Sequence, residues 1–130
     1  MAELIRLLLA DDQALIRDAF ATLLGLERDF EVVAQVGSGD AVLPAAREHR
    51  PDVCLLDIEM PGIDGIEACR QLTGADLGSR VLIVTTFGRP GYLRRALEAG
   101  ASGFIVKDTP AAQLIDAVRR TACGEGVDRL

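Results

Sequence analysis

The feature that most constrains the fold is a regular alternation of short apolar runs with longer segments in which apolar residues recur at helical spacing. The first run, Leu4 to Ala10, is almost continuously apolar, which is typical of a strand buried on both faces of a parallel sheet. The next segment, Asp12 to Leu24, carries apolar pairs four residues apart, which predicts an amphipathic helix. The alternation then predicts strands at 30–36, 52–57, 81–85 and 104–106, and helices at 40–50, 63–72, 90–100 and 110–122.

Five strand–helix units in 130 residues predict an α/β fold with a parallel sheet and helices on both faces. An open, doubly wound sheet of five strands is favoured over a barrel, because a barrel needs eight such units. Pro44 leaves the start of the second helix undetermined. The final residues, GEGVDRL, show no periodicity. We therefore expect one domain over 1–123, followed at 124–130 by a frayed tail or the start of a linker.

Composition restricts the classes of function. A net charge of −6 argues against a nucleic-acid-binding surface on this domain. No apolar run approaches the ~20 residues that a membrane-spanning helix needs, and acidic residues interrupt the apolar start too early for a signal peptide. The three cysteines form no CxxC pair, which fits a reducing compartment better than a disulfide framework or a zinc site. These features predict a cytoplasmic protein without membrane contact.

Polar side chains stand at the ends of four predicted strands. Asp11 and Asp12 follow the first strand, and Asp57 ends the third. Thr85 ends the fourth strand, and Lys107 follows the fifth. Working groups in open α/β sheets gather outside the carboxyl ends of the strands. Each residue alone has an ordinary explanation as a helix cap, a turn, a strand residue or a solvated charge. Their conjunction at one edge of the sheet predicts a functional site.

The residue types at this edge point to phosphoryl chemistry. Carboxylates held close together repel one another unless one takes a proton or a cation lies among them. Oxygen ligands without histidine or cysteine favour a hard ion, and Mg²⁺ in particular. A lysine and a hydroxyl facing the same point suit a transferring phosphoryl group, and an aspartate can be its acceptor. We therefore predict phosphoryl capture on Asp57 with Mg²⁺ as cofactor.

Four segments together resemble the receiver domain of two-component response regulators: LLLADDQALIRDAF, PDVCLLDIEMPGIDG, VLIVTTF and GASGFIVKD. The resemblance covers roughly residues 4–122 and implies a flavodoxin-like sheet with strand order 2-1-3-4-5 and five helices. Lys107 is followed by Asp108, where proline is common elsewhere in the family. In this feature the chain resembles the NarL/FixJ-type branch of the family.

The resemblance implies a role for each residue of the acidic site. Asp57 accepts the phosphoryl group from a phosphohistidine on a sensor histidine kinase. Asp12 and Asp57 bind Mg²⁺ directly, Asp11 binds it through water, and Glu59 contributes its main-chain carbonyl. Lys107 pairs first with Asp57 and then with the phosphoryl group. The domain is then a regulatory phosphoacceptor, which catalyses only its own phosphorylation and dephosphorylation.

The resemblance also implies roles in switching and in the lifetime of the phosphorylated state. Thr85 hydrogen-bonds a phosphoryl oxygen and moves inward on activation. Phe104 stands three residues before the lysine, at the position of the family's aromatic switch, but it lacks a hydroxyl. Any switching at Phe104 is therefore by burial alone. Glu59 and Phe87 flank the site where the family tunes hydrolysis of the phosphoryl group.

The resemblance implies that phosphorylation controls dimerisation and transcription. Branch members carry a helix-turn-helix DNA-binding domain after a linker, so nucleic acid would be bound only by an output domain that this chain does not contain. We expect a homodimer through the first and fifth helices. In the fifth helix, apolar Leu114, Ile115 and Val118 alternate with charged residues, as in a transient interface.

Three alternatives remain open at this stage. The chain could be a stand-alone receiver that acts through protein–protein contacts. It could be a Mg²⁺-dependent phosphatase with an aspartyl-phosphate intermediate, although that class normally carries DxD after its first strand and a cap over its substrate. It could also be a receiver-like module that binds partners without phosphorylation, although such a module has no reason to keep the complete acid set and Lys107.

Overall fold

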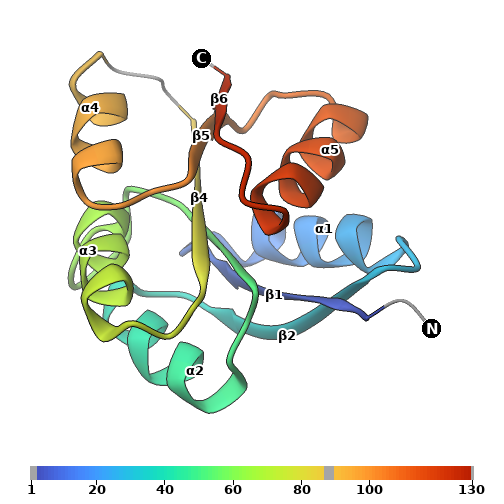
Figure 1. The fold of residues 1–130 in the computed structure, drawn as a ribbon, viewed down its shortest axis with the longest axis horizontal. Coiled ribbons are helices and arrows are strands. Elements are labelled where there is room, and N and C mark those ends of the chain that lie inside the picture. The colour runs from blue at the N-terminus through green and yellow to red at the C-terminus, as the bar shows by residue number, and fades with distance from the viewer. Residues whose placement is uncertain (1–2, 87–89, 130) are drawn as a thin grey trace.

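The computed structural model describes residues 3–86 and 90–129, which form a parallel sheet with helices on both faces (Figure 1). The strand order is β2-β1-β3-β4-β5-β6. No helix in this part of the chain is long and apolar enough to cross a bilayer. The elements are β1 Ile5–Ala10, α1 Ala14–Gly25, β2 Phe30–Val36, η1 Gly39–Ala41, α2 Val42–His49, β3 Val53–Leu56, α3 Gly65–Ala75, β4 Arg80–Thr85, α4 Pro90–Glu98, β5 Gly103–Val106, α5 Ala111–Ala122 and β6 Val127–Arg129.

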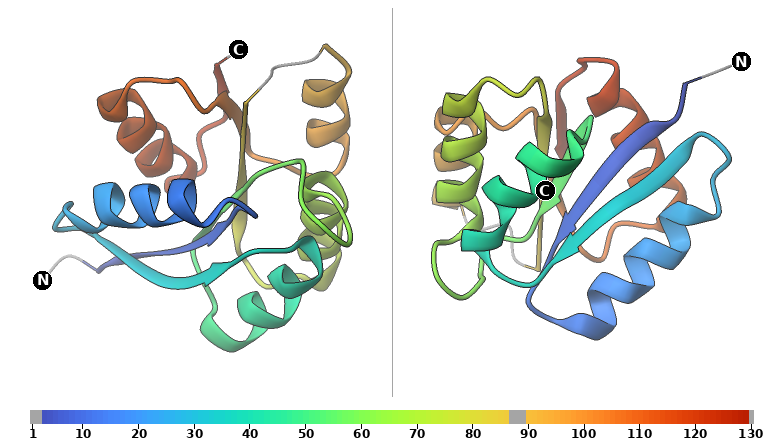
Figure 2. Two further views of the ribbon diagram at one scale, coloured as in Figure 1. Left: turned by 180° about the vertical axis from the view of Figure 1, so that it is seen from behind. Right: turned by 90° about the horizontal axis from the view of Figure 1, so that it is seen from below.

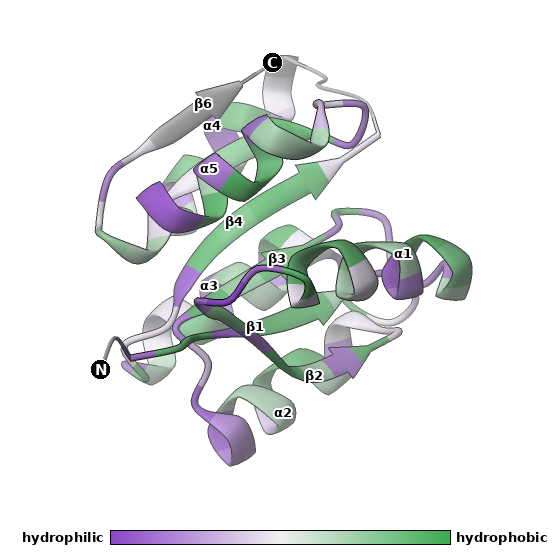
Figure 3. Ribbon diagram, turned by 90° about the vertical axis from the view of Figure 1, so that its right-hand side faces the viewer, coloured by the Kyte–Doolittle hydropathy of each residue, from purple (hydrophilic) through white to green (hydrophobic). Residues whose placement is uncertain are grey.

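The central strands send alternate side chains into two separate cores. Leu8 and Cys54 face the side covered by α2, α3 and α4, whereas Leu7 and Val53 face α1 and α5 (Figures 1 and 2). All four side chains are fully buried. Because both faces are covered, the strands are apolar along most of their length, as the green of β1, β3 and β4 shows (Figure 3). The predicted fold and the order of the first five strands are confirmed.

The second helix begins with a short 3₁₀ turn, η1, and continues as α2 from Val42. Pro44 lies in the first turn of α2, where a residue without an N–H group costs no intrahelical hydrogen bond. The proline is therefore compatible with the helix that the spacing predicts.

The expectation of a frayed tail is wrong for residues 127–129, whose backbone forms β6 beside β5. The end of α5 explains the reversal of the chain. Gly124, at φ +90°, donates its N–H to the carbonyl of Thr121, and Glu125 donates to that of Arg120. This pair of bonds is a Schellman motif, which needs glycine because of the positive φ. A three-residue strand is too short to show a period in the sequence.

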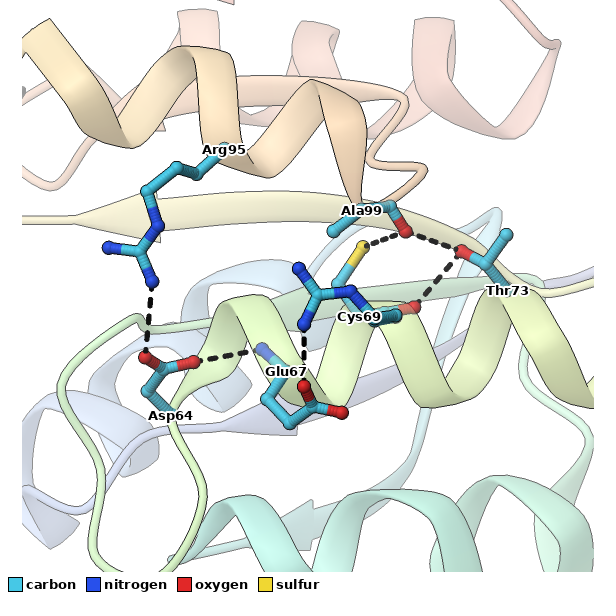
Figure 4. A network of polar contacts seen from close by, with 7 residues as sticks. Asp64, Glu67, Cys69, Thr73, Arg95 and Ala99 are labelled. Atoms are coloured by element: carbon cyan, nitrogen blue, oxygen red, sulfur yellow. Dashed lines mark hydrogen bonds and ion pairs between the residues drawn. The ribbon is translucent and has the colours of Figure 1, made fainter.

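Polar contacts join α3 to α4 at the start of α3 and again in its second half (Figure 4). Asp64 caps α3 by accepting a hydrogen bond from the N–H of Glu67, and its other oxygen lies 3.8 Å from the guanidinium of Arg95 on α4. Further along, the Cys69 thiol and the Thr73 hydroxyl both donate to the carbonyl of Ala99, which follows α4. These contacts tie the position of α4 to that of α3. The loop that leads into α3 begins with Asp57, directly after β3.

The fifth helix uses its main apolar residues for the core. Leu114 and Val118 are 4% and 0% exposed and pack against the sheet with Leu24 of α1. Their predicted place in a dimer interface is therefore wrong. The helix needs these side chains to cover one face of the sheet, and only Ile115 of the three remains partly exposed. On α1, by contrast, Leu15 is 83% exposed.

Candidate functional site

The carboxyl ends of four strands deliver the predicted polar residues to one edge of the sheet. Asp11 directly follows β1, Asp57 follows β3, and Lys107 follows β5. Hydrogen bonds between neighbouring strands fix their heights, because Asp57 N–H donates to the carbonyl of Ala10 and Lys107 N–H donates to that of Thr85. The convergence predicted from the sequence is therefore produced by the parallel register.

Lys107 lies between two carboxylates. Its Nζ is 2.7 Å from Oδ2 of Asp11 and 3.1 Å from Oδ2 of Asp57, and all three side chains are at least nine-tenths buried. The remaining oxygens also have partners: Asp57 Oδ1 accepts from the N–H of Ile58, and Asp11 Oδ1 accepts from that of Gln13. These contacts hold the buried charge cluster in a fixed geometry.

The electrostatic environment moves two pKa values upward. Burial raises the pKa of Asp57, and the nearby Asp11 adds to this effect, while Lys107 and the Ile58 N–H oppose it. Burial alone would lower the pKa of Lys107, but its hydrogen bond to Asp11 and the pairing with Asp57 outweigh that effect and raise it. At neutral pH, Lys107 therefore keeps its positive charge. This charge offsets part of the free-energy cost of ionising Asp57.

Three carboxylates are placed where a divalent cation can be held. One oxygen from each of Asp11, Asp12 and Asp57 lies within 4.8 Å of the others. Asp11 and Asp57 are buried, whereas Asp12 is exposed at the mouth of the site. An oxygen-only set that is open to water on one side fits the chemistry of Mg²⁺, which keeps several waters when bound. The residues present therefore fit the predicted cofactor.

An open pocket lies above these carboxylates. It contains the predicted residues Asp57, Glu59 and Thr85, and its full lining is Asp12, Gln13, Asp57, Glu59, Thr85 and Thr86. Thr85 is 4% exposed at the pocket wall, and Glu59 is exposed. The structure thus gathers the candidate acceptor, the metal ligands and the hydroxyl around one space.

Phe104 does not line this pocket. It is fully buried in the core beneath α4. Phe87 lies outside the described residues. The assignment of Phe104 as a switch and of Phe87 as a lifetime residue stays a prediction.

Two residues that contact the main chain of Asp57 and Asp11 were not predicted from the sequence. Gly65, at the start of α3, lies so close to the loop after β3 that a Cβ there would overlap the carbonyl oxygen of Asp57. Arg17 of α1 donates to the carbonyl of Asp11 at 2.7 Å. The Asp64-Gly65 dipeptide reads as ordinary turn chemistry, and Arg17 reads as an exposed helical charge. Neither residue type signals its contact.

Comparison with known proteins identifies the family from the sequence. Residues 7–119 match the response regulator receiver domain. The chain is 40% identical to the transcriptional regulatory protein DesR of Bacillus subtilis, over 95% of this chain and 61% of DesR. The chain therefore spans about three fifths of the length of this relative.

Solved structures give the same result. The signal receiver domain of NarL from Mycobacterium tuberculosis superposes with a TM-score of 0.91 at 34% identity, covering 95% of this chain and 99% of that one. A DNA-binding response regulator of the LuxR family from Staphylococcus aureus gives 0.85 at 35% identity, covering 92% and 99%. With the acidic cluster and Lys107 at the edge of a 2-1-3-4-5 sheet, these matches show that the chain belongs to the family of response regulator receiver domains.

Proposed function

We propose that this domain accepts a phosphoryl group on Asp57 from a phosphohistidine of a sensor histidine kinase. The observation that carries the proposal is Lys107, whose ammonium lies within 3.1 Å of both Asp11 and Asp57 beside an open pocket. A buried carboxylate with a fixed cation beside it and solvent access above it is suited to nucleophilic attack on a phosphoryl group. The proposed receiver unit comprises residues 1–123, and 124–130, of which 127–129 pair with β5 as β6, would lead toward an output domain.

The transfer can be written with the residues at the site. A carboxylate oxygen of Asp57 attacks phosphorus as the P–N bond of the phosphohistidine breaks, and the departing imidazole nitrogen keeps the bonding electron pair. Lys107 would pair with a phosphoryl oxygen, and the Thr85 hydroxyl would donate a hydrogen bond to another. Glu59 and Phe87 are proposed to tune the later attack of water that removes the group.

Asp12 and Asp57, with Asp11 through water and the Glu59 carbonyl, are the residues that would hold Mg²⁺. When bound, Mg²⁺ supplies neutralisation of the charge that develops on the phosphoryl oxygens. The Asp12 carboxylate is exposed, so replacing it should disturb the packed structure little. The family is regulatory, and we propose no catalysis beyond phosphorylation and dephosphorylation of Asp57 itself.

The output proposed for the domain is transcriptional. Thr85 and Phe104 would change position on phosphorylation, and α4, which packs over Phe104, would transmit the change to the surface. The relatives DesR and the S. aureus LuxR-family protein are named as transcriptional and DNA-binding regulators. We propose a DNA-binding output through a further domain and a cytoplasmic location. A stand-alone receiver acting through protein contacts is the alternative.

Incubation with acetyl phosphate tests the proposed function directly. The intact mass should increase by one phosphoryl group when Mg²⁺ is present and remain unchanged when Mg²⁺ is chelated. A protein that gains no phosphoryl group under either condition, or gains it equally well in chelator, contradicts the proposal.

Replacement of Asp12 should separate metal binding from folding. At a Mg²⁺ concentration 100 times its dissociation constant, a protein that binds only when folded gains about 2.7 kcal/mol in the free energy of unfolding. Asp12→Asn should lose most of this gain at the same concentration, while its metal-free stability should stay near that of the wild type because the side chain is exposed. Thermal unfolding with and without Mg²⁺ measures both quantities. An equal Mg²⁺ response in the two proteins would exclude Asp12 as a ligand.

Phosphorylation is proposed to favour a homodimer through α1 and α5, with the exposed Leu15 as its apolar contact. Sedimentation with beryllofluoride, a phosphoryl mimic, should show tighter dimerisation than without it. Leu15→Asp should weaken the dimer by roughly tenfold or more, because it buries a charge at the interface. Leu97→Asp is the matched control, since Leu97 is an exposed leucine on α4. A loss of dimer in the Leu97 variant alone would place the interface at α4.

A further inference from the structure

Arg17 is the fourth residue of α1, near the amino end of the helix, where a positive charge is electrostatically disfavoured. The amino end of a helix carries the positive end of the helix dipole. The first turn itself contains no acidic residue, and Arg17 shares its surroundings with Asp11 and Asp57 of the acidic cluster. Residues that break a local rule of this kind are expected mainly at functional sites.

The guanidinium of Arg17 is directed beneath the acidic cluster. Its Nη1 donates a hydrogen bond to the main-chain carbonyl of Asp11 at 2.7 Å. Gly37, just after β2, lies close to the guanidinium: a Cβ there would be 3.2 Å from Nη1, a tight contact. Arg17 therefore fixes the backbone immediately before Asp12 and joins the end of β1 to α1.

A small cavity lies beside this arginine and under Asp57. Its volume is about 10 Å³, close to the minimum that holds one water molecule. Asp11, Arg17 and Asp57 form its polar walls, and the remaining walls are Leu9, Ala10, Phe20, Leu55 and Val84. Nε of Arg17 is buried and has no hydrogen-bond partner among the described residues. A buried N–H without an acceptor is costly, and buried water commonly supplies the missing partner.

We propose that Arg17 is a positioning residue for the phosphoryl site, acting on Asp11 directly and on Asp57 through one internal water in this cavity. The water accepts a hydrogen bond from Nε and donates to the carboxylates that line the cavity. Asp57 already has one donor at each oxygen, from Ile58 and Lys107. The water adds a third contact from the α1 side, so that the acceptor is held from three directions. The role rests on the proposed function of Asp57, whereas the water site itself does not.

Nuclear magnetic resonance tests the water site without Mg²⁺ or phosphodonor. In isotope-labelled protein, the Arg17 Nε–H should exchange slowly with solvent and show a cross-peak to a long-lived water. The Nε–H of Arg28, an exposed arginine, should show neither property. A rapidly exchanging Arg17 Nε–H, or one without the water cross-peak, overturns the proposal.

Substitution tests the positioning role. Arg17→Met keeps the apolar stem and should lower the rate of phosphorylation by acetyl phosphate roughly tenfold or more at saturating Mg²⁺, at an unchanged half-saturating phosphodonor concentration. Arg17→Lys, which keeps the charge, serves as the second variant if the first folds poorly, and should also be slow. Arg28→Met removes an equal charge and should react like the wild type.

The outcomes separate this inference from the function on which it rests. A normal rate in both Arg17 variants, a change confined to the melting temperature, or an equal loss in Arg28→Met overturns the positioning role. If the wild-type protein shows the water cross-peak but accepts no phosphoryl group, the proposed function fails while the water site stands.

Discussion

Asp57→Asn is expected to abolish phosphoryl acceptance. The amide is a far weaker nucleophile than the carboxylate, and removal of a nucleophile from a preformed site lowers rates by several orders of magnitude. Intact mass after incubation with acetyl phosphate and Mg²⁺ should therefore show only unmodified protein. The exposed Asp18 on α1 provides a matched control, because Asp18→Asn removes an equal charge away from the site and should be phosphorylated normally. Phosphorylation that persists in Asp57→Asn would mean that another residue is the acceptor.

The same variant should be more stable than the wild type at neutral pH without divalent metal. The pKa of Asp57 is raised above its ordinary 3.8 by burial. Folding therefore favours the protonated form; this contribution is fully present below pH 3.8 and is lost as the pH rises through the raised value. At pH 7 the wild type carries an ionised, desolvated carboxylate, and asparagine removes that cost. The difference in melting temperature should shrink as the pH falls toward 3.8, and a variant less stable than the wild type at pH 7 would contradict this account.

The position of the site could be predicted because it depends on topology. Parallel strands end at the same edge, so residues that follow separate apolar runs must meet there, as Asp11, Asp57 and Lys107 do. The types of these side chains, carboxylates beside an ammonium group, then indicate which chemistry the site can perform. None of this needs an exact element boundary, which is why small differences at the ends of helices and strands did not disturb it.

Other features depend on contacts that a one-dimensional pattern does not contain. The apolar residues of α5 are compatible with either a core or an interface, and only the packing of Leu114 and Val118 against the sheet decides between them. β6 depends on a helix-ending turn at Gly124 and on the unpaired edge of β5. Arg17 reaches back along the chain to its carbonyl partner, Asp11, from the following helix. In each case the sequence permits the contact without signalling it.

Gly65→Ala is expected to destabilise the fold and disable the site together. Gly65 does not need a positive φ, so alanine is compatible with the backbone conformation. The obstacle is space, since the new Cβ would overlap the carbonyl of Asp57, a main-chain group that cannot rotate away. That carbonyl and the Gly65 N–H, which donates to Ile58, belong to the loop that carries the acceptor. We expect a loss of about 3 kcal/mol in the free energy of unfolding, because strain of this kind is among the largest single-residue effects.

Gly74→Ala in the same helix is the matched control for Gly65→Ala. Gly74 is exposed, and a Cβ there would meet no atom within 4 Å. Alanine is the better helix former, so this change should stabilise the protein by about 0.5–1 kcal/mol. Denaturant unfolding measures both variants, and acetyl phosphate measures the site in whatever fraction remains folded. Because the displaced carbonyl belongs to Asp57 itself, folded Gly65→Ala should be phosphorylated at least tenfold more slowly than Gly74→Ala. Equal rates would mean that the acceptor loop tolerates displacement, and that the close contact with α3 serves packing alone.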